Sequence, residues 1–578
     1  MRSNAQADRK RVPALSERLL TRIRQNEEQL FLVLTLVIGV TVGLTIVAFV
    51  LLTERVGIRL YPPGGAAWRR LAMPVIGALI TGYLLFRHFP NARGSGIPQT
   101  KTALFVGRGV ITLRTVVGKF LCSSVSLASG IALGREGPSV HIGAGIASVI
   151  GRAMRLSPKK VEALVPVGAA AALAAAFNTP IAAVLFSLEE VMGDLHAPLL
   201  GSVVLSSATS WIVLHLVLGD EPLFHVPSYK LVHPVEFIFY AVLGLIGGLV
   251  SVWFVKMILW MRPRFLALPE KTQWFQPVAG GLLVGILGWF VPQVLGVGYI
   301  YVGDALNGKM LFEVMALLVI LKVLATTTSY ASGNAGGIFG PSLFIGAMTG
   351  GTVGSLAHAL LPTYTASPGA YALVGMGTAF AGIVRVPLTS VIMIFEMTRD
   401  YSIIVPLMIS NLVSFYVSYR LQRQPIYEAL AHQDGIHLPN MAAQRVPRQL
   451  SVSAASRTPV ATIDAGMTPT EALALMQAHK SNRLPVVDGK RFLGMISRVE
   501  LNTARAALKE VRHAMKSEFP HLHPDHTLDL ALHRMGSSHT QELPVVSRRD
   551  VHKLEGVVHL DDVLQLYGVL QDDQSEEQ

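Results

Sequence analysis

The chain has 578 residues, of which 51% are hydrophobic and 15% are charged, and its mean hydropathy is +0.47. Soluble proteins carry roughly 25% charged residues, so this composition excludes an ordinary soluble protein and predicts a polytopic membrane protein. The net charge of +12 does not indicate a nucleic acid partner, because Lys and Arg gather in the cytoplasmic segments of membrane proteins. The single cysteine, Cys122, excludes an internal disulfide.

The first 30 residues are polar and basic, and we expect them to form a cytoplasmic tail. They are too long and too charged for the start of a signal peptide. Residues 31–52 and 71–89 are apolar runs, each long enough to span a bilayer. Five more full-length runs follow, at residues 199–218, 235–253, 278–295, 311–330 and 403–419.

Other apolar segments look short because Gly or Pro interrupts them. Interrupted segments in matching positions of two halves indicate a midplane binding site in a transporter. Arg135 and Glu136 stand side by side within such a region, and ionisable residues at membrane depth usually mark an ion or proton path. A helix start attracts anions, so we interpret residues 134–140 as an anion site with a carboxylate beside it. The segments predicted to be short are residues 137–150, 180–188, 340–347 and 387–395.

The two halves of the apolar region match at an offset of 203 residues, which places Lys119 over Lys322 (322 − 119 = 203). The same offset aligns Gly-Pro-Ser at residues 137–139 with Gly-Pro-Ser at residues 340–342. Chance similarity between Gly-rich segments does not account for two aligned lysines. We predict a repeat with halves at residues 70–220 and 275–421, and an inverted one, because inversion brings broken helices together at the membrane centre.

The composition changes after Tyr419, and we expect a linker at residues 431–456. Leu-Pro-Val-Val then occurs twice, at residues 484–487 and 543–546, each time after a helical pattern and before a strand that Gly opens. Two β-α-β units of this length predict a pair of stacked α+β modules. The expected fold is therefore an all-α polytopic membrane domain at residues 31–430, α+β modules at 457–507 and 508–568, and an acidic tail at 569–578.

The chain resembles the CLC family of chloride channels and chloride/proton exchangers over residues 31–430, and its C-terminal modules are similar to a CBS-domain pair. Three family signatures carry the resemblance: Gly-Ser-Gly-Ile-Pro at 94–98, Gly-Arg-Glu-Gly-Pro at 134–138 and Gly-Ile-Phe-Gly-Pro at 337–341. The resemblance implies a homodimer of the prokaryotic type, in the bacterial inner membrane, with both termini in the cytoplasm.

By this resemblance, the central chloride site is formed by Ser95, Ile338, Phe339 and Tyr427. Hydroxyl and backbone N–H donors suit such a path, since the anion has to be bound without being trapped. Arg135 and Lys119 would raise the potential along the pathway. Taken singly, these residues have other interpretations: a helix N-cap for Ser95, an interfacial aromatic for Tyr427 and a headgroup contact for Lys119. Serine at position 95 favours chloride, because relatives that prefer nitrate tend to have proline there.

The resemblance makes Glu136 the gate, whose ionised carboxylate competes with the anion and whose protonated form swings out. Glu190 matches the inner proton-transfer glutamate, which channels of the family commonly lack, and we therefore expect chloride/proton antiport. The alternative is a voltage- or proton-gated passive chloride channel, in which Glu189 and Glu190 are ordinary solvated acids at a helix end.

CBS pairs often bind adenosine nucleotides with an acid on the ribose, and Glu500 and Asp562 hold that position. His559 replaces the usual Ser or Thr, so a purely structural dimerisation module is an equal alternative. We expect no required cofactor beyond bound chloride, and no enzyme, since there is no Walker loop and no His-Glu-x-x-His motif. A membrane-anchored CBS nucleotide sensor would leave the repeat unexplained, and a magnesium transporter would need clustered acids.

Overall fold

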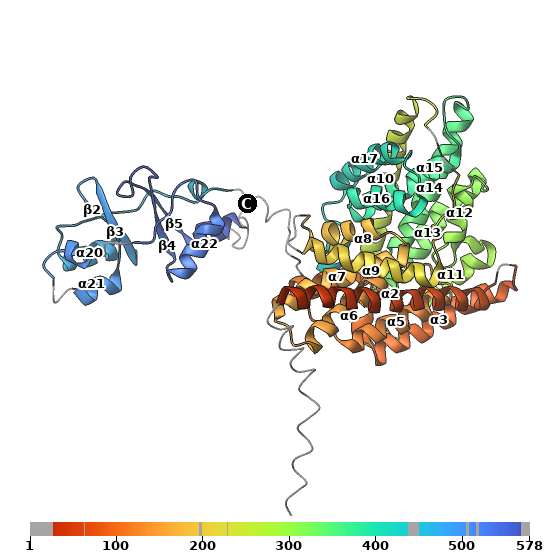
Figure 1. Cartoon of the computed structure of the whole chain (residues 1–578), viewed down its shortest axis with the longest axis horizontal. Coiled ribbons are helices and arrows are strands. Elements are labelled where there is room, and N and C mark those ends of the chain that lie inside the picture. Colours follow the sequence, from red (N-terminus) through yellow and green to blue (C-terminus); the bar gives the residue numbers. More distant parts are fainter. Residues whose placement is uncertain are drawn as a thin grey trace, which may run out of the picture. The chain divides into compact units, whose positions relative to one another are not determined.

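The computed structural model describes residues 27–62, 64–195, 199–227, 229, 231–436, 438, 450–504, 508–515 and 519–567. The predicted N-terminal tail up to residue 26, residues 437 and 439–449 of the predicted linker, and the predicted acidic tail lie outside these residues. The chain divides into two compact units, Met1–Leu438 and Pro439–Gln578 (Figure 1).

The first unit is built of helices. Among the described residues, eight of them are long and apolar enough to cross a membrane. The helices are α2 (Glu27–Leu60), α3 (Ala67–Arg87), α4 (Ile97–Phe105), α5 (Leu113–Ala128), α6 (Glu136–Ala153), α7 (Pro158–Phe177), α8 (Pro180–Phe186), α9 (Leu200–Leu218), α10 (Glu236–Leu266), α11 (Pro277–Phe290), α12 (Tyr299–Leu306), α13 (Phe312–Ala331), α14 (Phe339–Leu360), α15 (Pro368–Val384), α16 (Pro387–Thr398), α17 (Ile404–Leu421) and α18 (Ile426–Gln433). Short helical turns are η1 (Pro90–Ala92), the π-helical η2 (Ser187–Met192), η3 (Glu270–Thr272) and η4 (Pro292–Val294).

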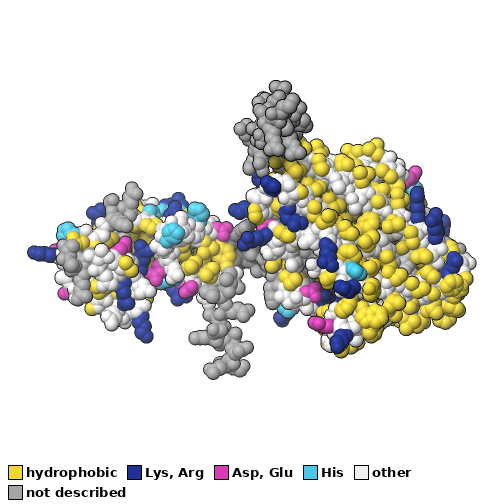
Figure 2. Space-filling view, turned by 90° about the horizontal axis from the view of Figure 1, so that it is seen from below, with side chains coloured by type: hydrophobic (Ala, Val, Ile, Leu, Met, Phe, Trp, Pro, Cys, Tyr) yellow, Lys and Arg dark blue, Asp and Glu magenta, His cyan; other side chains and the backbone are white. Residues whose placement is uncertain are grey.

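Hydrophobic side chains cover much of the visible face of the first unit, whereas charged side chains are dispersed over the second unit (Figure 2). A backbone that is hydrogen-bonded within helices, under an apolar surface, is what a multi-pass membrane domain requires. Six of the seven runs predicted to span a bilayer lie in helices that are long and apolar enough to cross a membrane. The prediction is wrong for residues 278–295, because α11 ends at Phe290 after 14 residues. The all-α membrane domain predicted from the sequence is confirmed.

The prediction of four short segments is half right. Two of them are short, because α8 has 7 residues and α16 has 12. The prediction is wrong for the other two, which belong to α6 with 18 residues and α14 with 22. Pro138 and Pro341 lie in the first turns of these helices, where a missing N–H disturbs no helical hydrogen bond, so proline does not interrupt them.

The two lysines that the repeat aligns make equivalent contacts. Lys119 Nζ donates to the carbonyl oxygens of Ala92, at 3.0 Å, and Gly94. Lys322 Nζ donates to two carbonyls 28 and 26 residues before it, those of Val294 at 3.0 Å and Gly296 at 2.6 Å. Both lysines are fully buried, so each supports the loop that precedes a helix of its own repeat.

The two repeats are antiparallel where they meet. Gly134 and Gly337 exchange two backbone hydrogen bonds of 2.7 Å in an antiparallel bridge. Glu396, near the end of α16, accepts from the backbone N–H groups of Ile181 and Ala182 at the start of α8, at 3.0 and 2.7 Å. Glu189, just beyond α8, accepts in turn from the N–H of Thr389 at the start of α16, at 2.9 Å. A glutamate at the C-terminal end of each short helix therefore accepts hydrogen bonds from the N-terminal N–H groups of the other short helix. This reciprocal contact is what an inverted repeat requires.

The repeats also occupy different sides of the first unit. Helices α5, α6, α7 and α9 lie on one side with α2, whereas α10, α14, α15 and α17 lie on the other (Figure 1). The loops before α6 and α14 meet between them.

The second unit contains two small α+β modules. In the first, β1 (Ile463–Asp464) pairs parallel with β2 (Arg483–Asp488), and β2 pairs antiparallel with β3 (Arg491–Ser497). In the second, β4 (Glu542–Val546) pairs antiparallel with β5 (Leu554–His559). The helices are α20 (Pro469–Ala478), α21 (Arg498–Ala504), α22 (Leu528–Ser537) and α23 (Leu560–Leu566), with short turns η5 (Val452–Ala454) and η6 (Val511–Ala514). The helices predicted near Pro469 and Leu528 begin at those residues, which confirms the α+β pair.

Candidate functional site

The three sequence signatures of the membrane unit come together in space. A Cβ added to Gly137 would lie 2.5 Å from the carbonyl oxygen of Ser95 and 3.3 Å from the Cα of Gly337. A Cβ added to Gly96 would lie 2.2 Å from the carbonyl oxygen of Gly137. No side chain fits into such distances, so the glycines allow the three backbones to approach one another.

Glu136 is fully buried at the first position of α6, and its carboxylate lies at the start of α14. Its Oε2 accepts a hydrogen bond of 3.0 Å from the backbone N–H of Gly340, and its Oε1 accepts from the hydroxyl of Tyr299. The N–H groups and the dipole of a helix start are the donors that an anion uses. The carboxylate of one repeat thus accepts a hydrogen bond from the helix start of the other repeat, where the donors suit an anion.

Arg135 forms its ion pair with Glu54 on α2, at 2.5 Å, and its guanidinium lies 5.4 Å from the ring centroid of Tyr299. Tyr299 therefore touches both members of the Arg135–Glu136 pair. The sequence analysis missed Tyr299, which follows Gly298 at the start of α12 and belongs to no recognised motif.

Ser95 and Tyr427 are both fully buried, and neither hydroxyl has a hydrogen-bond partner among the described residues. Helix α18, which carries Tyr427, packs against α4, which begins just after Ser95. An unpaired buried hydroxyl costs about 1–3 kcal/mol, so two of them, one on α18 and one just before α4, suggest a bound partner. Ile338 and Phe339, also fully buried, begin α14 and complete the predicted chloride set.

Lys119 does not reach a lipid headgroup, because its side chain is fully buried. The ammonium is held by the two carbonyls of the loop before Ser95. Its position next to this loop is compatible with the predicted effect on the potential of the pathway, and the same contacts hold the loop in place.

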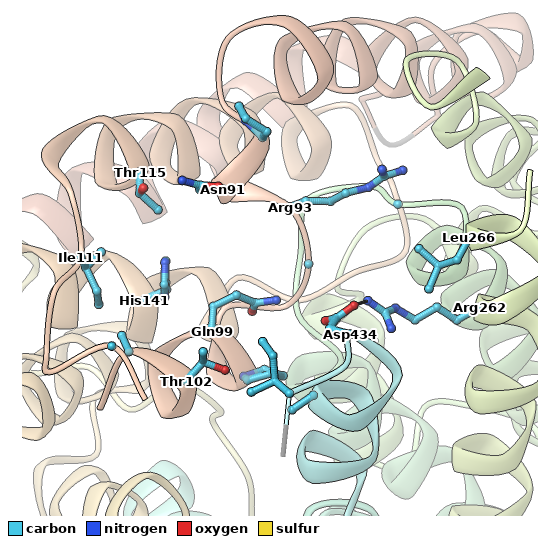
Figure 3. Close-up of a pocket in the computed structure, with 18 of the residues that line it drawn as sticks. Asn91, Arg93, Gln99, Thr102, Ile111, Thr115, His141, Arg262, Leu266 and Asp434 are labelled. Carbon is cyan, nitrogen blue, oxygen red and sulfur yellow. Dashed lines mark hydrogen bonds and ion pairs between the residues drawn. The ribbon is translucent and has the colours of Figure 1, made fainter. Parts of the chain in front are cut away.

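A cavity of about 480 Å³ reaches the site from one side (Figure 3). Its wall includes Gly94, next to Ser95, and His141 on α6. Arg262 and Asp434 form an ion pair of 2.5 Å at this cavity, and Arg93 lies nearby, hydrogen-bonded to two glutamine side chains. The sequence analysis missed these two arginines, which no spacing rule connects with the signatures.

A second cavity, of about 460 Å³, reaches the site from the side of Glu136. Its wall includes Glu54, Arg135 and Tyr299. The two cavities thus lie against different parts of the predicted site, because one is lined by Gly94, the residue before Ser95, and the other by Arg135, the residue before Glu136.

Glu190 lies on η2 with only 6% of its side chain exposed, and Lys101 Nζ lies 2.8 Å from its Oε1. Its neighbour Glu189 accepts hydrogen bonds from the N–H and the hydroxyl of Thr389 at the start of α16. Neither glutamate is therefore an ordinary solvated acid at a helix end. The sequence analysis also missed Lys101, although it stands only three residues after the Gly-Ser-Gly-Ile-Pro signature (101 − 98 = 3).

In the second unit, the two predicted ribose acids are engaged within the chain. Glu500 Oε2 accepts from the N–H and the hydroxyl of Ser497, at 2.8 and 2.7 Å. Asp562 forms an ion pair with Arg457 through its Oδ1, whereas its Oδ2 has no hydrogen-bond partner among the described residues. His559 Nδ1 lies 3.2 Å from a carboxylate oxygen of Glu542, and this hydrogen bond raises the pKa of His559.

The family model described as "Voltage gated chloride channel" matches residues 76–419, and the model described as "CBS domain" matches residues 452–506 and 508–568. The chain is 35% identical over 370 residues to the "H(+)/Cl(-) exchange transporter ClcA" of Vibrio campbellii, covering 63% of this chain and 79% of that relative. It is 35% identical over 379 residues to the "Putative chloride channel protein ClcB-like" of Ralstonia nicotianae, covering 64% of this chain and 88% of that relative.

Solved structures agree with these sequence matches. A slow cyanobacterial Cl⁻/H⁺ antiporter covers 70% of this chain and 97% of its own, with 27% identity and a TM-score of 0.65. A eukaryotic CLC transporter covers 94% of this chain and 98% of its own, with 22% identity and a TM-score of 0.59, and this likeness concerns the fold.

Proposed function

The chain belongs to the voltage-gated chloride channel family and is a multi-pass membrane protein with a CBS pair, and from this premise we propose that it exchanges chloride for protons. In this proposal Glu136 is the gate and Glu190 is the inner proton-transfer acid. Ser95, Tyr427 and the backbone at Ile338 and Phe339 bind the chloride.

The main support for the proposal is the position of the Glu136 carboxylate on the N–H of Gly340. A carboxylate and a chloride ion need the same donors at the start of α14, so only one of them can be there at a time. A proton on Glu136 removes the negative charge that the donors attract and frees them for the anion. Uptake of a proton and entry of a chloride are thereby coupled at one group.

Glu190 supports proton movement from the other side of the site. It is an acid with little exposure, and ionisable residues inside a membrane domain usually serve transport. Ser95 lies just before α4 and Tyr427 lies on α18, and neither hydroxyl has a partner among the described residues. Helix α4 contacts both α18 and η2, the turn that carries Glu190.

A passive chloride channel is the second candidate. The ion pair of Glu190 with Lys101 favours it, because a carboxylate that is permanently paired carries no protons. The two relatives named above divide in the same way, one being called an exchange transporter and the other a putative channel.

Flux measurements on the full chain in liposomes distinguish the two candidates. Under a chloride gradient, we expect protons to move against the chloride flow in the unaltered protein. Glu190→Gln should abolish the proton movement while chloride still passes. Chloride flow without proton movement in the unaltered protein would establish the passive channel instead.

Family membership also leads us to propose a homodimer in a bacterial inner membrane, with both termini in the cytoplasm. Apolar residues that are about half exposed line one face of α17, namely Val405, Met408, Leu412, Tyr416 and Tyr419. Such a face can pack against a second copy or against lipid. Light scattering in detergent, with the detergent mass subtracted, should give twice the chain mass of 62.3 kDa, and a monomer mass would contradict the dimer.

A further inference from the structure

Lys101 is a buried cation close to the proposed proton path. It lies on α4, six residues after Ser95 (101 − 95 = 6), and 10% of its side chain is exposed. The described residues contain three buried lysines. Lys119 and Lys322 donate to backbone carbonyls, whereas Lys101 faces two carboxylates. A buried ammonium between two acids is not needed to hold a loop.

The two carboxylates differ in distance and in exposure. Lys101 Nζ lies 2.8 Å from Glu190 Oε1 and 3.9 Å from Glu428 Oε1. The Glu190 side chain is 6% exposed and the Glu428 side chain is 31% exposed. The three residues come from η2, α4 and α18, so the ammonium lies between a buried acid and one that is more accessible to water.

The surrounding charges make Lys101 the main cation for Glu190. The other ionisable groups that act on Glu190 are Glu189 on the same turn, and Glu428 and Tyr427 on α18. None of these is a cation. Glu428 also interacts electrostatically with a second cation, Arg385.

We propose that Lys101 is a positioning residue for proton transfer, which binds Glu190 while this acid is ionised and moves to Glu428 when Glu190 takes up a proton. This inference rests on the proposed role of Glu190. In the loading step, a carboxylate oxygen of Glu190 accepts a proton from hydronium, which leaves as water, and Lys101 keeps its three protons. The protonated acid no longer attracts the ammonium, and Glu428 is the carboxylate next to it.

The arrangement gives the two partners of Lys101 opposite effects on proton loading. Removing the ammonium takes away the charge that favours ionised Glu190, so Glu190 should load at higher pH. Removing the Glu428 carboxylate leaves Lys101 with Glu190 as its only close acid in the described part of the chain, so loading should need a lower pH. A defect in folding or packing has no reason to act in opposite directions.

The experiment measures chloride-driven proton flux of the full chain in liposomes, with equal pH on both sides, as a function of that pH. We expect Lys101→Gln to move the pH profile to the alkaline side by about 1 unit or more, as for the loss of an opposite charge within 4–6 Å. Lys101→Arg keeps the charge and should stay close to the unaltered protein. Glu428→Gln should move the profile to the acid side.

Coinciding profiles for Lys101→Gln and Lys101→Arg would overturn the inference, and so would shifts of Lys101→Gln and Glu428→Gln in the same direction. If Lys101→Gln does not fold, Glu428→Gln still decides, because an alkaline shift or an unchanged profile contradicts the inference. Glu190→Gln separates a failure of the role of Lys101 from a failure of the proposed function. Loss of proton flux in Glu190→Gln without a shift in Lys101→Gln rejects the role of Lys101 alone, whereas full proton flux in Glu190→Gln rejects the proposed function as well.

Discussion

The two repeats of the membrane unit share their backbone supports but differ in their charged side chains. Lys119 and Lys322 hold equivalent loops, and Gly134 and Gly337 pair with each other across the repeat (337 − 134 = 203). At the next two positions the first repeat has Arg-Glu, at residues 135–136, and the second has Ile-Phe, at residues 338–339.

The same contrast recurs at the ends of the short helices. Glu189 and Glu396 correspond (396 − 189 = 207), and each accepts from the first N–H groups of the other repeat's short helix. One residue further, the first repeat has Glu190 and the second has Met397. The residues that the two repeats share therefore support the backbone, whereas the acids proposed for transport lie at positions where the repeats differ.

The strongest test of this comparison is Glu136→Gln. The amide cannot ionise, so it neither competes with chloride as an anion nor carries a proton. We expect loss of proton movement, and chloride flux that no longer depends on pH, in liposome assays. Glu189→Gln is the matched control, because Glu189 is an acid that both repeats share. This variant should keep the proton movement and the pH dependence of the chloride flux. Unchanged proton coupling in Glu136→Gln would contradict the assignment of the gate.

Replacing a shared lysine should affect stability most. Lys322→Met removes the donor to two buried carbonyls, and the unpaired carbonyls should lower the free energy of unfolding by about 2–4 kcal/mol. Lys119→Met should cost a similar amount, because its contacts are equivalent. Thermal unfolding in detergent measures both. A neutral effect in one of the two would show that the repeats do not share this support.

Ser95→Pro tests a residue whose hydroxyl is proposed to bind chloride and which belongs to the first repeat only. Proline removes both the hydroxyl and the N–H, so discrimination in favour of chloride should fall and nitrate should be preferred. The change should be about two- to tenfold, the size of one net hydrogen bond. Reversal potentials with the two anions measure it. Ser95→Ala, which keeps the N–H, should show the smaller shift, and an unchanged anion order in Ser95→Pro would count against the chloride site.

The two capping glutamates should give small and equal effects. In Glu189→Gln and Glu396→Gln the amide oxygen can still accept from the helix N–H groups, so only the charge on the helix start is lost. We expect each variant to lose about 1 kcal/mol of stability, with transport unchanged. Differential scanning fluorimetry compares the stability of the two variants. A large difference in stability between them would show that the two glutamates are not equivalent.

The second unit extends the comparison on a smaller scale. Ser497 and His559 are equivalent, but Ser497 is bonded to Glu500 and His559 to Glu542. Because the hydrogen bond to Glu542 raises the pKa of His559, the bond stabilises the folded unit below about pH 6.5, the ordinary value of histidine. That contribution is lost as the pH rises through the raised value. With His559 41% exposed, the effect should be about 0.2–1 kcal/mol.

Hydrogen exchange of the full chain at several pH values can follow this small effect in β5. His559→Gln should flatten the dependence on pH. Ser497→Ala in the other module should leave the pH dependence as it is. An equally steep dependence in His559→Gln would show that another group is responsible.

Much of this architecture could be predicted from periodicity and repeated letters. The offset of 203 residues aligned Lys119 with Lys322, and the structure shows that the two lysines make equivalent contacts. The repeated Leu-Pro-Val-Val correctly predicted a strand in each module. The lengths of α6 and α14 were mispredicted, because a proline in the first turn of a helix reads in the sequence like an interruption. Tyr299, Arg262 and Lys101 were missed since their partners are more than 80 residues away in the chain, and no local pattern records such contacts.

The paired hydrogen bonds between Gly134 and Gly337 restrict how this protein can work. Carriers with inverted repeats commonly expose their cargo to either side by rocking one half against the other. Here the loops before α6 and α14 are joined by these hydrogen bonds, which a rocking motion would break in every cycle. We therefore expect turnover to depend on the rotation of a few side chains inside a rigid frame, and its speed to be insensitive to cross-links placed between the two halves.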